Sequence, residues 1–284
     1  MNNTFRDQAQ TLREMMDRRS NETKVIAVTS GKGGVGKSSI SVNLAIALSA
    51  MGLRVLVVDA DFGLANVDVM LGVNSKYNLS HLLRGEKTLS EIIQEGHNGV
   101  RFISGGSGVY ELLKMDEAQV AEVMKDLMNL KNPADVILFD SGAGINENVI
   151  QLVLASSETI VVTTPEPTAI LDAYALIKTI IKRQGSHKIR IIMNKGETKK
   201  EAETAMNGFQ KVIKRYLGAE VELLGYVLYD NDVIKSIKQQ TPLLVSKPDG
   251  AAAKSIHSIA EKLVNLPTGQ PAAGRFSRLF SRWF

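Results

Sequence analysis

A glycine-rich loop between an apolar run and a helical segment is the feature of this sequence that most constrains its fold. The run KVIAVTS (24–30) is almost continuously apolar, which is typical of a strand buried on both faces of a sheet. The loop that follows fits the pattern G-x-x-x-x-G-K-[ST] from Gly31 through Lys37 to Ser38. Residues 38–52 are mostly small and apolar, with helical composition. A strand, this loop and a helix in that order predict a P-loop in an α/β fold.

Further runs along the chain repeat the alternation of strand and helix. Runs rich in β-formers, each ending in polar or glycine residues, lie at 54–61, 100–106, 134–142, 158–165 and 188–195. Segments of helical composition lie at 116–130, 168–183 and 199–217. We therefore expect a doubly wound, mostly parallel sheet with helices on both faces. A single domain accounts for most of the length, and the expected divisions are an N-terminal segment 1–23, the domain 24–265, a linker 266–274 and a C-terminal helix 275–284.

Composition limits the classes of protein to which the chain can belong. The sequence has 44% apolar and 23% charged residues, which is ordinary for a globular protein. It has no Cys, which excludes disulfides, zinc–thiolate sites and iron–sulfur clusters held by the chain's own thiolates. We find no secretion signal and no run of about 20 apolar residues, so a cytoplasmic location is expected. Residues 275–284 carry three arginines and no acid, which is most of the net charge of +4, so no nucleic acid is expected as the main ligand.

The loop itself has the composition of a phosphate cradle. Glycine lets backbone amides close around phosphate oxygens, and the positive end of the following helix points at them. The expected cradle residues are Gly31, Gly33, Gly34, Val35, Gly36 and Ser39. Lys37 is expected to reach the β- and γ-phosphates of a nucleotide, and Ser38 to place its hydroxyl on Mg²⁺. Lys32 is a second cation in a variable position of the pattern, and a single cradle does not require it.

Three carboxylates follow buried runs of the predicted sheet. Asp59 and Asp61 come at the end of RVLVVDAD, and Asp140 comes at the end of ILFD. A single Asp after a strand is more often a helix cap or turn residue than a metal ligand. Three at one sheet edge beside a P-loop favour a Mg²⁺ site, because this hard cation prefers oxygen ligands and keeps several waters.

The motifs GKGGVGKSS, VVDADFGLANVD, ILFDSGAGI, TTPEPTAILDAYALIK and MNK together resemble those of the deviant Walker A ATPases of the MinD/ParA group. The resemblance covers about residues 24–266. It implies hydrolysis of ATP to ADP and phosphate, with Mg²⁺, in a homodimer that forms when ATP is bound. It also implies a role for Lys32, which in this family crosses the dimer interface to the nucleotide of the other subunit. There it stabilises charge on the phosphates as an arginine finger does.

The same resemblance implies roles for residues beyond the loop. Asp61 is expected to activate the attacking water and to act with Lys32 and Lys37 in catalysis, while Asp59 and Asp140 lie on the Mg²⁺ side. The other expected nucleotide contacts are Asn194 at the adenine edge, Tyr229 and Asp230 beside the base, and Glu147 at the partner's nucleotide. Taken alone, Asn194 also fits a turn residue.

The N-terminal segment distinguishes between members of this family. The flagellar members, MinD-like regulators of flagellar number and placement, carry a D-Q-A-x-x-L-R element that is matched here by Asp7, Gln8, Ala9, Leu12 and Arg13. In those regulators the element activates the signal-recognition-type GTPase FlhF, so FlhF is an expected partner, with flagellar switch or C-ring proteins as further candidates. An ordinary solvated helix also fits these residues. Within the family, the alternatives to a flagellar regulator are a ParA-type DNA-segregation ATPase and a division-site MinD.

The C-terminal residues have the pattern of an amphipathic membrane-binding helix. Apolar residues recur at helical spacing, at Phe276, Leu279, Phe280, Trp283 and Phe284. The other face carries Arg275, Arg278 and Arg282. This pattern predicts reversible binding to anionic lipids at the inner face of the cell membrane. Docking of the helix on the chain's own core is the alternative interpretation.

Overall fold

A computed structural model of the chain describes residues 23–61, 66–105, 134–185 and 187–264. The expected N-terminal element, the expected helix at 116–130, the linker and the C-terminal amphipathic helix lie outside these residues. Within the described residues, no helix is both long enough and apolar enough to cross a bilayer.

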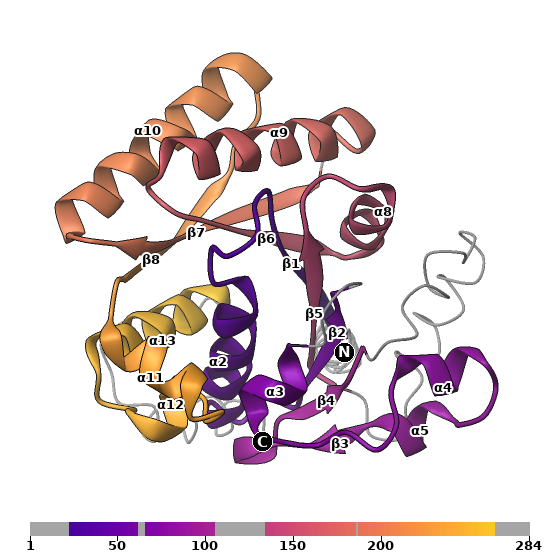
Figure 1. Cartoon of the computed structure of the whole chain (residues 1–284). Coiled ribbons are helices and arrows are strands. Elements are labelled where there is room, and N and C mark those ends of the chain that lie inside the picture. Colours follow the sequence, from indigo (N-terminus) through magenta and orange to yellow (C-terminus); the bar gives the residue numbers. More distant parts are fainter. Residues whose placement is uncertain (1–22, 62–65, 106–133, 186, 265–284) are drawn as a thin grey trace, which may run out of the picture.

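The centre of the fold is an eight-stranded sheet with the strand order β3-β4-β2-β5-β1-β6-β7-β8 (Figure 1). The strands are β1 (Lys24–Ser30), β2 (Val55–Ala60), β3 (Gln94–Glu95), β4 (Arg101–Ile103), β5 (Val136–Ala143), β6 (Glu158–Thr163), β7 (Lys188–Gly196) and β8 (Glu222–Leu228). The two-residue β3 pairs antiparallel to β4, and the other pairs are parallel. The predicted doubly wound, mostly parallel sheet is confirmed.

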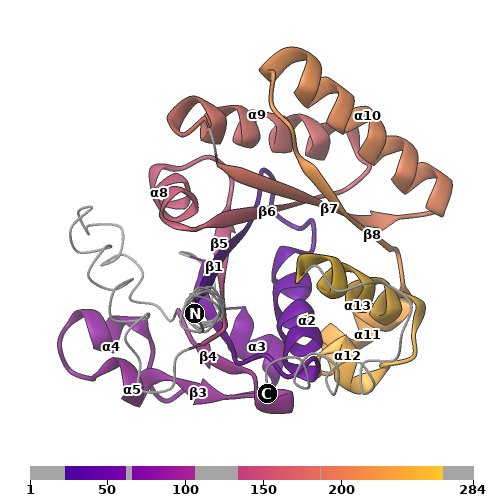
Figure 2. The same ribbon diagram turned by 180° about the vertical axis from the view of Figure 1, so that it is seen from behind.

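Helices cover both faces of this sheet (Figures 1 and 2). The described helices are α2 (Lys37–Ala50), α3 (Val67–Leu71), α4 (Leu79–Leu83), α5 (Leu89–Ile92), α8 (Glu147–Ala155), α9 (Pro167–Arg183), α10 (Lys199–Leu217), α11 (Asn231–Lys238), α12 (Leu243–Ser246) and α13 (Ala251–Leu263), with a 3-10 turn at His97–Gly99. On one face α2 and α13 share a core with alternate residues of β1 and β2. On the opposite face α8, α9 and α10 pack on β1, β6 and β7. This double cover explains why the inner strands are apolar throughout.

The helix that follows the P-loop is buried along most of its length. Every residue of α2 from Lys37 to Leu48 is buried, between the sheet and α13. Its many Ser and Ala side chains are small enough to permit this close packing. Both ends of the P-loop are therefore fixed, one by β1 within the sheet and the other by α2, which packs between the sheet and α13.

Candidate nucleotide-binding site

The P-loop connects β1 to α2 at the carboxyl edge of the sheet and requires glycine at specific positions. Gly34 and Gly36 have φ values of +79° and +90°, in the left-handed region that favours glycine. Gly31 packs directly on the backbone of Asp172 in α9, and a Cβ there has no room. The loop lines a cavity of about 360 Å³, together with Lys37, Ser38 and Ser39. A cavity bounded by loop glycines and the start of α2 is suited to an anionic ligand.

Lys37 is held by a carboxylate within β5. Its Nζ lies 2.9 Å from Asp140 Oδ1, and both side chains are buried. Ser41, one turn further along α2, donates to the same oxygen at 2.7 Å. The second oxygen of Asp140, Oδ2, is buried and has no hydrogen-bond partner among the described residues. A buried, unsatisfied carboxylate oxygen beside the Ser38 hydroxyl fits a Mg²⁺ ion or its bound water, so these residues suit the expected metal.

Asp59 lies next to Asp140 across the β2–β5 pair. It is fully buried and accepts hydrogen bonds from the backbone amides of Asp61, Asn66 and Val67. Burial, followed by the charge of Asp140, raises the pKa of Asp59 to about 7, although the three amides act in the opposite direction. A divalent cation at this place favours the ionised form of Asp59.

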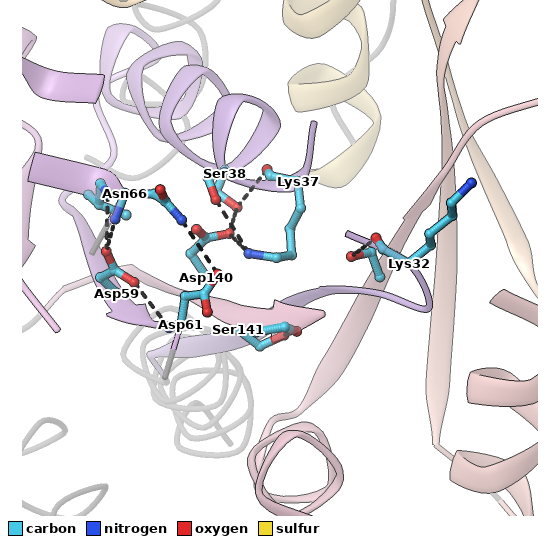
Figure 3. Close-up of polar contacts among 12 residues, drawn as sticks. Lys32, Lys37, Ser38, Asp59, Asp61, Asn66, Asp140 and Ser141 are labelled. Atoms are coloured by element: carbon cyan, nitrogen blue, oxygen red, sulfur yellow. Dashed lines mark hydrogen bonds and ion pairs between the residues drawn. The ribbon is translucent and has the colours of Figure 1, made fainter. Parts of the chain in front are cut away.

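Asp61 reaches the cavity from the end of β2. The Asn66 side chain donates to its Oδ2 at 3.4 Å (Figure 3). The structure thus gathers Lys37, Asp140 and Asp61 on one side of the loop, where the sequence predicted them. Asn66 and Ser41 were not among the predicted site residues. The motif VVDADFGLANVD contained Asn66, and the i+4 spacing from Lys37 on a helix was the available signal for Ser41.

Lys32 points away from this group (Figure 3). Its Nζ lies 3.0 Å from Glu166 Oε2 and 3.1 Å from Thr168 Oγ1, at the start of α9. Both partners of the ion pair are substantially exposed, at 41% for Lys32 and 65% for Glu166. The second lysine of the motif is therefore directed to the surface and not to the phosphate cradle of its own chain.

The expected base-binding residues border the same cavity. Asn194, Tyr229 and Asp230 all line it. The Asn194 amide donates to the carbonyl of Val35 in the P-loop at 2.8 Å, within β7 and not in a turn. Tyr229 is 55% exposed, and Asp230 caps the start of α11 by accepting from the amide of Asp232.

Lys195 was predicted at the end of the strand run 188–195, and the structure confirms this position. It belongs to β7, where its Nζ donates to the Gly34 carbonyl at 2.6 Å, and α10 begins at Lys199. Glu147 is bonded through both carboxylate oxygens to Arg183 and does not line the cavity. Its expected contact with a partner's nucleotide stays a prediction.

A parallel sheet with a P-loop at its carboxyl edge, a buried Lys–Asp pair and an unsatisfied carboxylate oxygen defines a P-loop nucleoside triphosphatase. The model of the ParA family, described as "NUBPL iron-transfer P-loop NTPase", matches residues 21–264. The chain therefore belongs to the ParA/MinD family of ATPases. Because the sequence has no Cys, this chain has no thiolates of its own to hold an iron–sulfur cluster.

Individual relatives place the chain near flagellar proteins of this family. It is 36% identical to the antiactivator FleN of Pseudomonas aeruginosa over 244 residues, 86% of this chain and 87% of FleN. It is 39% identical to the flagellum site-determining protein YlxH of Helicobacter pylori over 249 residues, 87% of this chain and 84% of YlxH. These similarities confirm the predicted resemblance to FlhG, the MinD-like regulator of flagellar number and placement.

A solved relative connects the fold to its ligand. The septum site-determining protein MinD of Pyrococcus horikoshii, in complex with Mg-ADP, superposes with a TM-score of 0.70 at 27% identity, covering 85% of this chain and 96% of that one. Binding of a nucleotide with Mg²⁺ is thus a property of the family.

Proposed function

We propose that this protein is an ATP-dependent dimerising switch that regulates flagellar number or placement. The relatives FleN and YlxH support the flagellar assignment, since their names refer to flagellar or regulatory roles. The outward direction of Lys32 supports the dimer, because a lysine that serves a second subunit must leave its own site. ATP is the proposed ligand, together with a Mg²⁺ ion that Ser38, Asp59 and Asp140 would hold.

Within one subunit, the P-loop amides and Lys37 bind the phosphates. Lys37 exchanges its ion pair with Asp140 for the phosphate oxygens, which leaves Asp140 and the Ser38 hydroxyl for the metal side of the site. A Mg²⁺ ion held there would supply positive charge to neutralise the phosphates. Asp61, oriented by Asn66, positions and deprotonates the attacking water. Lys32 of the facing subunit supplies the last positive charge, so hydrolysis requires two ATP-loaded subunits.

The two terminal segments connect this switch to its partners. The C-terminal helix is too weak to anchor a single subunit, because the cost of ordering ten residues nearly offsets the burial of five apolar side chains and the attraction of three arginines to anionic lipid. A dimer presents two helices at high effective concentration, so membrane association follows the ATP state. Residues 7–13 activate FlhF, and the protein is otherwise cytoplasmic.

The GTPase rate of FlhF with the full chain, and with a chain lacking residues 1–20, tests the flagellar assignment. We expect stimulation by the full chain and by a peptide of residues 1–20, and none by the truncated chain or by a peptide with Gln8→Ala. Stimulation that survives the deletion contradicts the role of residues 1–20, and no stimulation by the full chain supports a division-site MinD instead. DNA binding that weakens steeply with salt supports a ParA-type segregation ATPase.

A further inference from the structure

Lys195 has a backbone conformation that lysine rarely adopts. Its φ is +59°, in the left-handed region that favours Gly and Asn. The pairing of β7 with β8 shifts at this residue, because Asn194 pairs with Val227 and Gly196 pairs with Leu228. Lys195 is therefore the extra residue of a β-bulge, a feature that redirects a side chain and often lies beside an active site. Strain of this kind persists only where the surrounding structure imposes it.

The bulge directs the Lys195 side chain to the P-loop. Its Nζ donates to the Gly34 carbonyl at 2.6 Å. The preceding residue, Asn194, donates to the Val35 carbonyl at 2.8 Å. Two consecutive residues of β7 thus hold two consecutive carbonyls of the loop.

Holding these carbonyls fixes the direction of two backbone amides. In a trans peptide unit the carbonyl and the following N–H point in opposite directions, and the described residues contain no cis peptide bond. The N–H of Val35 therefore points away from Lys195, and the N–H of Gly36 points away from Asn194. Gly34 and Gly36 are the residues whose backbones rotate most freely, so the peptide units between them need to be held. Successive backbone N–H groups that point to the same side of a loop form a binding site for phosphate.

We propose that Lys195 is a positioning residue of the nucleotide site, which keeps the P-loop amides of Val35 and Gly36 turned toward the phosphates before nucleotide binds. It acts through the Gly34 carbonyl and does not contact the phosphates. Its loss therefore weakens the binding of ADP and ATP alike. The family and its ATPase activity are sufficient for this inference, which does not depend on the flagellar role.

Three substitutions separate the effect of the Lys195 ammonium group on nucleotide binding from the effect of the backbone strain. Lys195→Met keeps the length of the side chain and removes the donor. Lys195→Gly removes the donor and also relieves the strain at φ +59°. Lys195→Arg keeps a charged donor. Lys199→Met is the matched control, because Lys199 is an exposed lysine that pairs with Glu203 within α10 and contacts no part of the P-loop.

The measurements are the Kd for Mg-ADP, the unfolding temperature and hydrogen exchange of the P-loop amides in the nucleotide-free protein. We expect Lys195→Met and Lys195→Gly to weaken ADP binding by about five- to tenfold, as loss of one charge-assisted hydrogen bond at a partly solvated position does. Exchange at Val35 and Gly36 should rise in both variants. Lys195→Arg should restore most of the affinity, and Lys199→Met should match the parent.

The Gly variant distinguishes positioning from a simple contribution to folding. Relief of strain should leave its unfolding temperature at or above that of the parent, while its affinity for ADP falls. Parental affinity in either Lys195→Met or Lys195→Gly overturns the proposal. A loss of affinity that occurs only together with a lower unfolding temperature overturns it as well.

Discussion

The Lys37 ammonium and one oxygen of Asp140 form a buried ion pair of 2.9 Å that joins the start of α2 to β5. The other oxygen of Asp140 is buried without a hydrogen-bond partner among the residues described. One carboxylate thus has two functions, because it holds the lysine with Oδ1 and offers Oδ2 to a cation.

Asp140→Asn should separate these two functions. The amide oxygen can still accept from Lys37 and Ser41, so we expect a folded protein whose affinity for ADP without Mg²⁺ equals or exceeds that of the parent. The gain in affinity on adding Mg²⁺ should fall by about tenfold or more, since a charged ligand is lost. Titrations with fluorescent ADP in EDTA and in Mg²⁺ measure both quantities. Ser41→Ala, which leaves the carboxylate in place, is the control and should keep the Mg²⁺ effect.

Asp59 predicts a pH dependence of stability in the absence of Mg²⁺. Its pKa in the folded protein is about 7, above the ordinary 3.8. The folded state therefore binds the proton more tightly, and this contribution is complete below about pH 4 and lost as the pH rises through 7. His187 and His257 act in the opposite direction, because burial lowers the pKa of each and their contribution is lost as the pH falls. Unfolding temperatures of the parent and of a variant with His187→Gln and His257→Gln, from pH 5 to 8 in EDTA, separate these effects.

In the variant with His187→Gln and His257→Gln we expect the unfolding temperature in EDTA to decline between pH 5 and pH 8. Saturating Mg-ADP should remove this decline, because the cation favours ionised Asp59. A flat profile in EDTA would contradict the raised pKa.

A buried ion cluster at the opposite edge of the sheet is expected to support the fold and not the site. Arg190 is 1% exposed and lies 2.9 Å from Glu222 and 3.4 Å from the buried Glu158. Its guanidinium also donates to the carbonyl of Leu263, the last residue of α13. Arg190→Met should cost about 3–5 kcal/mol in the free energy of unfolding, because it leaves Glu158 buried with fewer partners. Glu222→Gln, at an exposed partner, should cost less than about 1 kcal/mol. Urea unfolding measures the free energy of unfolding of both variants. Equal costs would contradict the larger contribution expected from the buried Arg190.

Sequence reasoning succeeded where the signal is local. The P-loop was located from its contiguous glycine pattern. The helix α10 was located closely because it is capped by Thr198 at its start and by Gly218, with a φ of +64°, at its end. The strand β8 was not predicted, since it is an edge strand with mixed burial and an internal glycine, Gly225. No local pattern marks it as the last strand of the sheet.

The roles of two lysines depend on contacts distant in sequence. Lys195 was placed in a strand, but its contact with the P-loop was not predicted, because the direction of its side chain follows from the bulge in the β7–β8 pair, which exists only once the sheet is assembled. Lys32 was identified as the additional cation, but its partners Glu166 and Thr168 lie more than 130 residues away in the sequence. Propensity and spacing do not show such contacts; tertiary structure does.

The contact between Lys32 and Glu166 predicts how readily the protein dimerises. If Lys32 serves the nucleotide of a second subunit, Glu166 competes with that nucleotide for the same ammonium group. Glu166→Gln should then favour the dimer formed with a non-hydrolysable ATP analogue. Because the pair is exposed and screened by water, the expected gain is small, about two- to fivefold in the dimer dissociation constant. Lys32→Ala should abolish the dimer while ADP binding by the monomer persists through Lys37 and the loop amides.

A double-mutant cycle measured by sedimentation tests the competition directly. In a Lys32→Ala background, Glu166→Gln has no ammonium to release, so it should have no effect on assembly. Glu203→Gln, which alters an exposed acid on α10, is the matched control and should leave the dimer constant unchanged. A full dimer in Lys32→Ala would refute the role of this lysine across the interface. If Lys32→Ala abolishes the dimer and Glu166→Gln has no effect, the role of Lys32 across the interface stands. Glu166 then does not restrain Lys32 before the dimer forms. The cycle therefore distinguishes a lysine that is needed in the dimer from one that is also restrained before the dimer forms.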